Sequence, residues 1–477
     1  MCTSILKVIQ NSFFTLLLTL LAGCQAVTYP DEKIASSIQE ICRKEYGIEH
    51  VDVKIVGRTI GVFLPLKKLF TMDVRHLVVS GQVENLESLF EPDPEAMNQL
   101  EDVLFAISRV MLSTDRPIDF YELRASDVEG TGLELVLKGY IPDVRRVRLW
   151  DIPRSEYRKR VIHELKLNRP ILWEKPVRDL FSNIGTMDAG ELGQRYFSVP
   201  PSPETVSGFF YDFLTALKHK QSARVELVAI RSHPFDNLQA LVYAKVRETF
   251  ERKPGTPPSL IPYSSGTEFE YIFIVQPAVT EYKIVHVIPF HYLDEMNQLR
   301  PVSFPRELAL YQNIDAWSER FAVEEIFLGE FLALQLNRRV QGLLTVDERV
   351  RLTINLARLQ FIFRGAGKEA AALGEEPRFE LYFNFVTKSM QTAPMTMERV
   401  IGDEDVLYVL EAALREFVLV IRSYRFTDYD RLELIWEPAG ASQAFKISPD
   451  ELDLFRRKKR ELQQLLGATS HLPSHTS

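Results

Sequence analysis

Residues 93–141 read DPEAMNQLEDVLFAISRVMLSTDRPIDFYELRASDVEGTGLELVLKGYI, and this stretch is the most direct indicator of the fold class. It opens with Asp-Pro-Glu, which is typical of a helix that has a side-chain cap and a proline at its first position. The apolar positions that follow have helical spacing: Leu100, Val103, Leu104, Ile107 and Met111. Residues 118–125 and 133–141 are rich in strand-forming residues. The stretch therefore predicts one amphipathic helix followed by two strands.

Three other parts of the chain predict the same helix–strand–strand unit. The first has a helix with Ile34, Ile38, Ile41 and Cys42 on one face, then strands at 51–56 and 59–64 around Gly57. The third begins at Ser202-Pro203-Glu204, with helix positions Val206, Phe209, Phe210, Phe213, Leu214 and Leu217, and strands at 225–231 and 238–246. The fourth has helix positions Val406, Leu410, Ala413, Leu414, Phe417 and Ile421, and strands at 431–436 and 444–447. These units predict an α+β fold of several helix–strand–strand modules with mostly antiparallel sheets.

The second and fourth units share a short sequence echo. Thr114-Asp115 and Thr427-Asp428 each end a predicted helix, and Glu122-Leu123 and Glu433-Leu434 each lie in the strand that follows. Helix–strand–strand units also recur by chance in α+β proteins, so duplication and chance recurrence both remain open.

A different segment separates the third and fourth units. Residues 268–275 and 282–288 predict a hairpin around Pro277-Ala278. A helical segment is expected around 316–364, with one helix at 316–340 and a second, after a capping box at 345–348, reaching about residue 364.

The predicted organisation follows from these elements. It comprises an α+β region with two units at 34–187, a linker at 188–203, the third unit at 204–252, a Pro-rich linker at 253–266, the hairpin with the helical segment and a strand at 267–395, the fourth unit with a C-terminal helix at 396–466, and a disordered tail at 467–477.

The N-terminal residues carry a sorting motif. Leu21-Ala22-Gly23-Cys24 closes an apolar run that begins at Phe13, and it resembles the lipobox of bacterial lipoprotein precursors. The resemblance implies that residues 1–23 are a signal peptide and that Cys24 is acylated on its sulfur and amine, leaving 24–33 as a lipidated N-terminus and short tether. Gln25 rather than Asp after the cysteine implies the periplasmic face of an outer membrane, if the cell has one. The alternatives are an ordinary signal peptide or a buried N-terminal helix.

Composition narrows the functional classes. The chain has 477 residues, of which 46% are hydrophobic and 26% charged, as in ordinary globular proteins. Its formal net charge of −8 argues against a nucleic-acid partner, which requires a positive surface. With Cys2 removed and Cys24 acylated, Cys42 is the one remaining thiol, so no intramolecular disulfide can form. Cys42 shares a helical face with Ile34 and Ile38, and we expect a core thiol.

No specific catalytic, metal or cofactor signature occurs in the sequence, so catalytic residues remain unknown and no cofactor is predicted. The best set of metal-ligand residue types is His286, His291, Asp294 and Glu295. His286 and His291 lie five positions apart on a strand and its exit, so they face opposite sides unless a bulge at Pro289 realigns them. We predict no metal site.

The charged clusters have structural explanations, and two have alternatives. Asp403-Glu404-Asp405 precedes a helix and complements its positive end. Residues 145–148 (Arg-Arg-Val-Arg) follow a strand and predict a solvated strand edge or, alternatively, a phosphate or lipid-headgroup patch. Ser448-Pro449-Asp450-Glu451 opens a helix that ends in five cations at 456–460, which stabilise the helix end or contact anionic lipid or an acidic partner.

The functional hypothesis rests on two expected features, the lipid anchor at Cys24 and the helix–strand–strand modules. Small helix–strand–strand modules look like those of envelope assembly and ring-building proteins, a likeness of architecture only. We expect a membrane-anchored envelope lipoprotein, a non-enzymatic scaffold or assembly factor that binds other envelope proteins. One alternative is an enzyme acting on cell wall or lipid through a site without a linear motif, and another is a lipid-anchored solute-binding protein.

Overall fold

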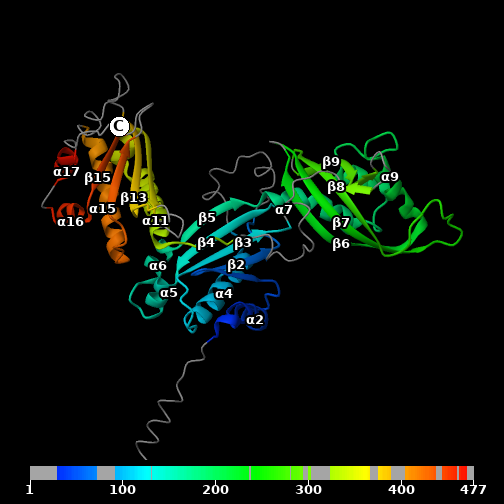
Figure 1. The fold of residues 1–477 in the computed structure, drawn as a ribbon, viewed down its shortest axis with the longest axis horizontal. Coiled ribbons are helices and arrows are strands. Elements are labelled where there is room, and N and C mark those ends of the chain that lie inside the picture. The colour runs from blue at the N-terminus through cyan, green and yellow to red at the C-terminus, as the bar shows by residue number, and fades with distance from the viewer. Residues whose placement is uncertain are drawn as a thin grey trace, which may run out of the picture. The chain divides into compact units, whose positions relative to one another are not determined.

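The computed structural model describes residues 29–71, 92–129, 131–235, 238–279, 281–293, 299–301, 323–365, 374–387, 403–436, 443–458 and 461–469. These residues fall into two compact units, 1–324 and 325–477, which are described separately (Figure 1). Helices and mostly antiparallel sheets occur in both units, so the predicted α+β fold class is confirmed. Among the described helices, none combines the length and the apolar composition required to cross a bilayer.

The N-terminal unit begins with two of the predicted helix–strand–strand units joined in one sheet. Its elements are η1 (Asp31–Lys33), α2 (Ile34–Tyr46), β1 (Asp52–Val56), β2 (Thr59–Leu66), α4 (Pro94–Met111), β3 (Phe120–Asp127), β4 (Leu133–Tyr140) and β5 (Ile162–Leu167). The strand order is β1-β2-β3-β4-β5, in which β2 and β3 are parallel and every other pair is antiparallel. Helices α2 and α4 contact each other and bury their apolar stripes against one face of the sheet (Figure 1).

Two short helices, α5 (Ile141–Arg148) and α6 (Arg154–Arg160), connect β4 to β5. The prediction that residues 145–148 form a strand edge is therefore wrong. Pro142 lies in the first turn of α5, where its fixed φ favours a helix and its missing N–H is not needed. Asp143 in the same turn is buried and accepts from Arg160 at 3.0 Å, which joins α5 to α6.

A second sheet follows in the same unit. Its elements are α7 (Arg169–Asn183), α8 (Ala189–Tyr196), α9 (Gly208–Thr215), η3 (Ala216–His219), β6 (Lys220–Pro234), β7 (Ala240–Arg252), β8 (Thr267–Pro277) and β9 (Tyr282–Pro289). The strands form an antiparallel meander in the order β6-β7-β8-β9, and the predicted hairpin around residues 277–278 is confirmed. A separate ribbon pairs β10 (His291–Leu293) with β11 (Leu299–Pro301).

Neither predicted linker of this unit is a linker. Residues 188–203 contain α8, because Asp188 and Glu191 form a reciprocal capping box that starts the helix. Residues 253–266 join β7 to β8, which are neighbours in one sheet, and Ile261 of this loop is fully buried against Phe250. The loop is therefore part of the folded body.

The C-terminal unit repeats the architecture of the first sheet. Its elements are α11 (Leu328–Val346), α12 (Glu348–Thr353), β12 (Ile354–Arg364), β13 (Arg378–Thr387), α15 (Glu404–Ser423), β14 (Arg431–Trp436), β15 (Gln443–Ile447), α16 (Pro449–Arg456) and α17 (Leu462–Thr469). The strand order is β12-β13-β14-β15, with β13 and β14 parallel and the outer pairs antiparallel. α17 extends three residues into the predicted tail, and residues 470–477 lie outside the described part.

Four predictions for 267–395 are wrong. The region is not one domain, because its hairpin pairs within the N-terminal unit whereas β12 and β13 pair with the fourth predicted unit. Residues 354–364 form a strand, in which Leu359 and Phe361 are buried and Arg358 and Gln360 are exposed, a period of two. The helix expected from 316 begins at Leu328, after a non-helical stretch at 323–327, and 316–322 lie outside the described residues. The cap of α12 comes from Asp347, whose Oδ1 accepts from the Val350 N–H at 3.2 Å, rather than from the predicted Thr345.

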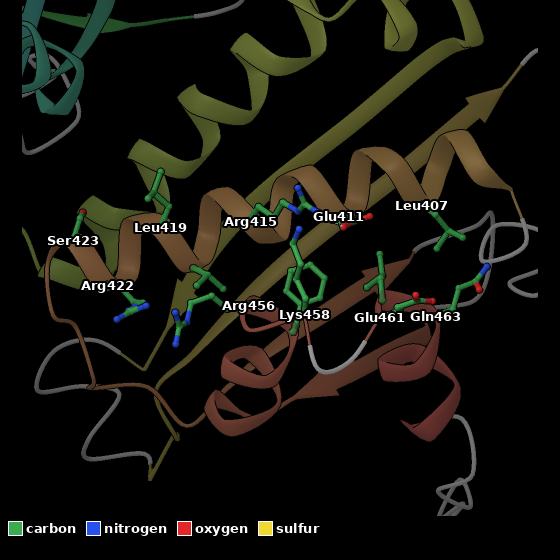
Figure 2. Close-up of a pocket in the computed structure, with 13 residues that line it drawn as sticks. Leu407, Glu411, Arg415, Leu419, Arg422, Ser423, Arg456, Lys458, Glu461 and Gln463 are labelled. Carbon is green, nitrogen blue, oxygen red and sulfur yellow. Dashed lines mark hydrogen bonds and ion pairs between the residues drawn. The ribbon is translucent and has the colours of Figure 1, made fainter.

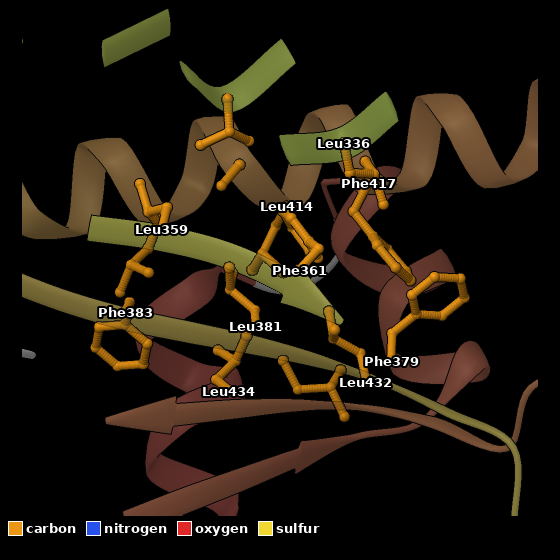
Figure 3. Close-up of a cluster of buried hydrophobic side chains, with 14 of the residues drawn as sticks. Leu336, Leu359, Phe361, Phe379, Leu381, Phe383, Leu414, Phe417, Leu432 and Leu434 are labelled. Carbon is orange, nitrogen blue, oxygen red and sulfur yellow. The ribbon is translucent and has the colours of Figure 1, made fainter. Parts of the chain in front are cut away.

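The core of the C-terminal unit lies between α11, α15 and one face of the sheet (Figure 3). Phe417 of α15 stacks on Phe361 of β12 with ring centroids 5.8 Å apart and meets Phe379 of β13 edge-on at 5.1 Å. The other labelled members are Leu336, Leu359, Leu381, Phe383, Leu414, Leu432 and Leu434. The amphipathic stripe of the predicted fourth helix therefore packs on the sheet, as its spacing indicates.

The sequence echo occupies equivalent positions in the two parallel-centred sheets. Glu122 of β3 lies opposite Lys138 of β4, and Glu433 of β14 lies opposite Lys446 of β15. The third predicted unit differs, because its sheet is antiparallel throughout. Shared strand order together with the echo supports kinship of the first and last sheets, but not of the middle one.

The thiol of Cys42 provides a test of the first core. Cys42 is fully buried, and burial together with the nearby Asp102 carboxylate raises its pKa to about 11. At pH 8 only roughly one molecule in a thousand would carry the thiolate. We expect a thiol reagent at pH 8 to label Cys42 in urea but not in the native chain, whereas the exposed control Ser36→Cys on the same helix labels at once. Rapid native labelling of Cys42 would contradict this packing.

Candidate functional site

A groove of about 900 Å³ lies in the C-terminal unit (Figure 2). One wall is α15, and the other is formed by the end of α16, the turn after it and the start of α17. The lining residues are Leu407, Glu411, Arg415, Val418, Leu419, Arg422, Ser423, Phe455, Arg456, Lys458, Glu461, Leu462 and Gln463. The groove lies wholly within one unit.

The α15 wall exists because this helix buries one apolar stripe and leaves a second stripe of mixed apolar and charged residues on its outer surface. The inner stripe, which includes Leu410, Leu414 and Phe417, is buried against the sheet. Residues 407, 411, 415, 418, 419 and 422 recur at intervals of three and four and form a second stripe on another face. Leu419 in this second stripe is 56% exposed, although it is a large apolar side chain.

The opposite wall is held in place by capping and packing. Ser448 and Glu451 form the predicted capping box that starts α16. Leu452 and Phe455 of α16 and Leu465 of α17 are buried in the core of the unit. The groove is therefore a fixed feature of the unit's surface.

The groove combines an apolar floor with an excess of positive charge. Arg415 is paired with Glu411 at 2.5 Å, and Arg456 is paired with Asp453 at 2.7 Å. Hydrogen bonding to Arg456 holds the pKa of Asp453 below its ordinary value, so this carboxylate stays ionised and offsets the arginine. Within the described residues, the two remaining cations of the lining have no ion-pair partner.

These two cations are Arg422 and Lys458, and both are exposed. Lys458 has a left-handed backbone with φ of 56° directly after α16, a conformation in which glycine is usual. The lining also contains the exposed Glu461, so its unpaired charges sum to one positive charge, and an anion with an apolar face can satisfy both the floor and this excess.

The candidate ligand residues named from the sequence do not form a site in the described structure. His286 is exposed on β9, and His291 pairs through Nδ1 with Glu270 at 3.1 Å. Asp294 and Glu295 lie outside the described residues, as does Cys24. In the ranges that the structure describes, no three metal-ligand side chains gather.

Two of the charged clusters named from the sequence are where the patterns placed them. Asp403 caps α15, with its Oδ1 accepting from the N–H groups of Asp405 and Val406 at 3.0 and 3.1 Å. Arg456 ends α16 as predicted, and Lys459 and Arg460 lie outside the described part. The outer stripe of α15 was not predicted, although its spacing is visible in the sequence once the inner stripe is assigned to the core.

A charged pair, Lys220 and Glu248, is buried in the antiparallel sheet of the N-terminal unit. Lys220 Nζ lies 2.7 Å from Glu248 Oε1 and donates to the Tyr263 hydroxyl at 2.5 Å, and it sits over the Phe213 and Phe250 rings. Burial lowers the pKa of Lys220, which Glu248 partly restores, and burial with the Glu248 charge raises the pKa of Tyr263. Neither charged side chain has any exposed surface, so the pair fastens the 253–266 loop to the sheet rather than binding a solute.

Comparison with protein-family models, curated proteins and solved structures finds no match to this chain.

The fastening role of the buried pair can be tested by mutation. We expect Glu248→Gln to lower the free energy of unfolding by about 3–5 kcal/mol, because it leaves an ammonium buried without its carboxylate. The combined Lys220→Met, Glu248→Leu and Tyr263→Phe variant should unfold close to the native urea concentration, since apolar groups replace the whole network. Urea denaturation of all three proteins measures this, and an unchanged midpoint for Glu248→Gln would refute the role.

Proposed function

We propose that this chain is a membrane-anchored bacterial envelope lipoprotein that acts as a non-enzymatic scaffold or assembly factor, located at the periplasmic face of the outer membrane if the cell has one. The single observation that carries the scaffold role is the groove between α15 and the α16–α17 pair, with its apolar floor and free cations. The anchor rests on the lipobox resemblance at residues 21–24. The partner would be another envelope protein.

The groove favours an acidic amphipathic segment as its occupant. An apolar stripe of such a helix would cover Leu419 and Val418, and its acidic side chains would meet Arg422 and Lys458. A 20-residue helix such as α15 offers a wall of about 30 Å, which is long enough for a partner helix of several turns. Helix-in-groove recognition uses this combination of apolar anchors and complementary charge.

The modular architecture supports the same role. The chain carries two separate parallel-centred sheets and one antiparallel sheet, so it presents several folded surfaces in one polypeptide. The unpaired cations of the groove, Arg422 and Lys458, favour an acidic over a basic occupant, although the chain as a whole carries a net charge of −8.

The occupant can be captured in place. A photo-cross-linking amino acid at Leu419 should, in native membranes, give one dominant adduct with another envelope protein. The control places the same group at Val346, which is 81% exposed in the same unit but does not line the groove, and it should give no such adduct. An equal pattern of adducts from both positions would contradict a specific groove partner.

Charge reversal tests the electrostatic part of the proposal. Arg422→Glu should reduce the Leu419 adduct by at least about threefold, because an exposed ion pair contributes roughly 0.2–1 kcal/mol and reversal adds repulsion of similar size. The matched control is Arg358→Glu, an exposed arginine on β12 outside the groove lining, which should leave the yield unchanged. Equal adduct yields from the two variants would contradict an acidic partner in the groove.

A further inference from the structure

The turn between α5 and α6 exposes two large apolar side chains in succession. Trp150 is 85% exposed and Leu149 is 72% exposed, and neither makes a ring contact among the described residues. The next residue but one, Ile152, is buried, so the turn is fixed to the body while its tip points outward. Two adjacent large apolar side chains form a small exposed apolar patch, which a contact outside the chain would bury.

The backbone conformation of the turn indicates that tryptophan at its tip does not stabilise the fold. The Asp151 N–H donates to the Arg146 carbonyl at 2.8 Å and the Trp150 N–H to the Val147 carbonyl at 3.3 Å, which is a Schellman helix end. Trp150 occupies its left-handed position with φ of 63°, where glycine is favoured and a large side chain is strained. A contact with a molecule outside the chain would explain why a large side chain occupies this strained and exposed position.

The tip is surrounded by positive charge. Five exposed cations lie on α5 and α6, and none has an ion pair within the described residues: Arg145, Arg148, Arg154, Arg158 and Lys159. Between residues 145 and 160 the acidic side chains are Asp151 and Glu156, and Glu156 is already paired with Arg160 at 3.0 Å. The surface therefore combines an exposed aromatic side chain with five unpaired cations on the two adjoining helices.

This framework is rigid. The buried Asp143 joins α5 to α6 through Arg160 at 3.0 Å, and the Tyr121 and Tyr157 hydroxyls meet at 2.9 Å between the sheet and α6. The backbone that carries the apolar tip and its cations is thus already ordered before binding, which lowers the entropic cost of binding.

We propose that the α5–α6 turn is a membrane-docking element that inserts Trp150 and Leu149 at the interface of an anionic bilayer while the surrounding arginines bind lipid phosphates. Trp is favoured at the headgroup level because one end of the ring system is apolar and the other polar. Lys and Arg near an anionic surface each add attraction. A protruding tip suits a bilayer, whereas an acidic protein partner would need a concave or extended face.

The place where the described chain begins supports a bilayer, and this step rests on the proposed anchor. The Tyr29 N–H donates to the Ser113 carbonyl at 2.8 Å, directly after α4, and the Ile141 N–H that starts α5 donates to the Asp119 carbonyl at 2.7 Å, directly before β3. Both points therefore lie on the connection from α4 to β3. The chain between Cys24 and Tyr29 reaches at most about 18 Å, so an acylated Cys24 would hold this connection near the lipid.

The test uses the non-acylated chain from Gln25 onward, which retains every described element, so its outcome does not depend on the anchor. We expect it to sediment with vesicles that contain phosphatidylglycerol and not with phosphatidylcholine vesicles. Arg145→Gln with Arg148→Gln should weaken partitioning by about 25-fold, roughly fivefold per charge. The control pair Lys218→Gln and Arg224→Gln, two exposed cations elsewhere in the same unit, should change it little.

Trp150→Gly separates docking from folding. Glycine relieves the left-handed strain, so this variant should unfold at an equal or higher denaturant concentration than the native chain. Its partitioning into the anionic vesicles should nevertheless fall by about tenfold, because the buried apolar side chain is lost. Absence of binding by the native chain, equal binding by Trp150→Gly, or an equal loss in the Lys218 and Arg224 control would each overturn the proposal.

Discussion

The structure depends on one constraint, the parallel pairing of two central strands in each of two sheets. β2 pairs in parallel with β3, and β13 pairs in parallel with β14. Parallel neighbours cannot be joined by a tight turn, so the chain must cross over one face of the sheet, and α4 and α15 lie on those crossovers. The inner stripe of α15 becomes core for this reason, and its outer stripe is left to form a wall of the groove.

Local patterns in the sequence predicted the helices well and the strand pairing poorly. The stripes of α2, α4 and α15 are periodic over several turns, and each helix is where its pattern placed it. Residues 354–364 were assigned to a helix although they form β12, because a short apolar run fits both periods and only pairing with β13 decides between them. The parallel pairs could not be predicted, since they join strands separated by more than forty residues.

The candidate surfaces were less predictable than the fold, for a related reason. The cations at 145–148 and 456–460 were visible as charge runs, but their meaning depends on what surrounds them. Trp150 is recognised as a candidate contact residue only because the structure places it in a left-handed conformation at a helix end. Arg422 is recognised only because α16 and α17 face α15 and form a groove with it. An acidic chain therefore carries two localised cationic surfaces, each with exposed apolar side chains, and we propose lipid for one and an acidic protein segment for the other.

The functional account requires that the N-terminal unit be held at a membrane, and that attachment is assigned to Cys24. The most direct test is mass spectrometry of the polypeptide purified from the membranes of its native cell. The account predicts a chain that begins at Cys24 and carries the mass of acyl groups on that residue. A chain that begins at Met1, or a free and unmodified terminus, would contradict acylation of Cys24 and would mean that the protein has no lipid anchor there.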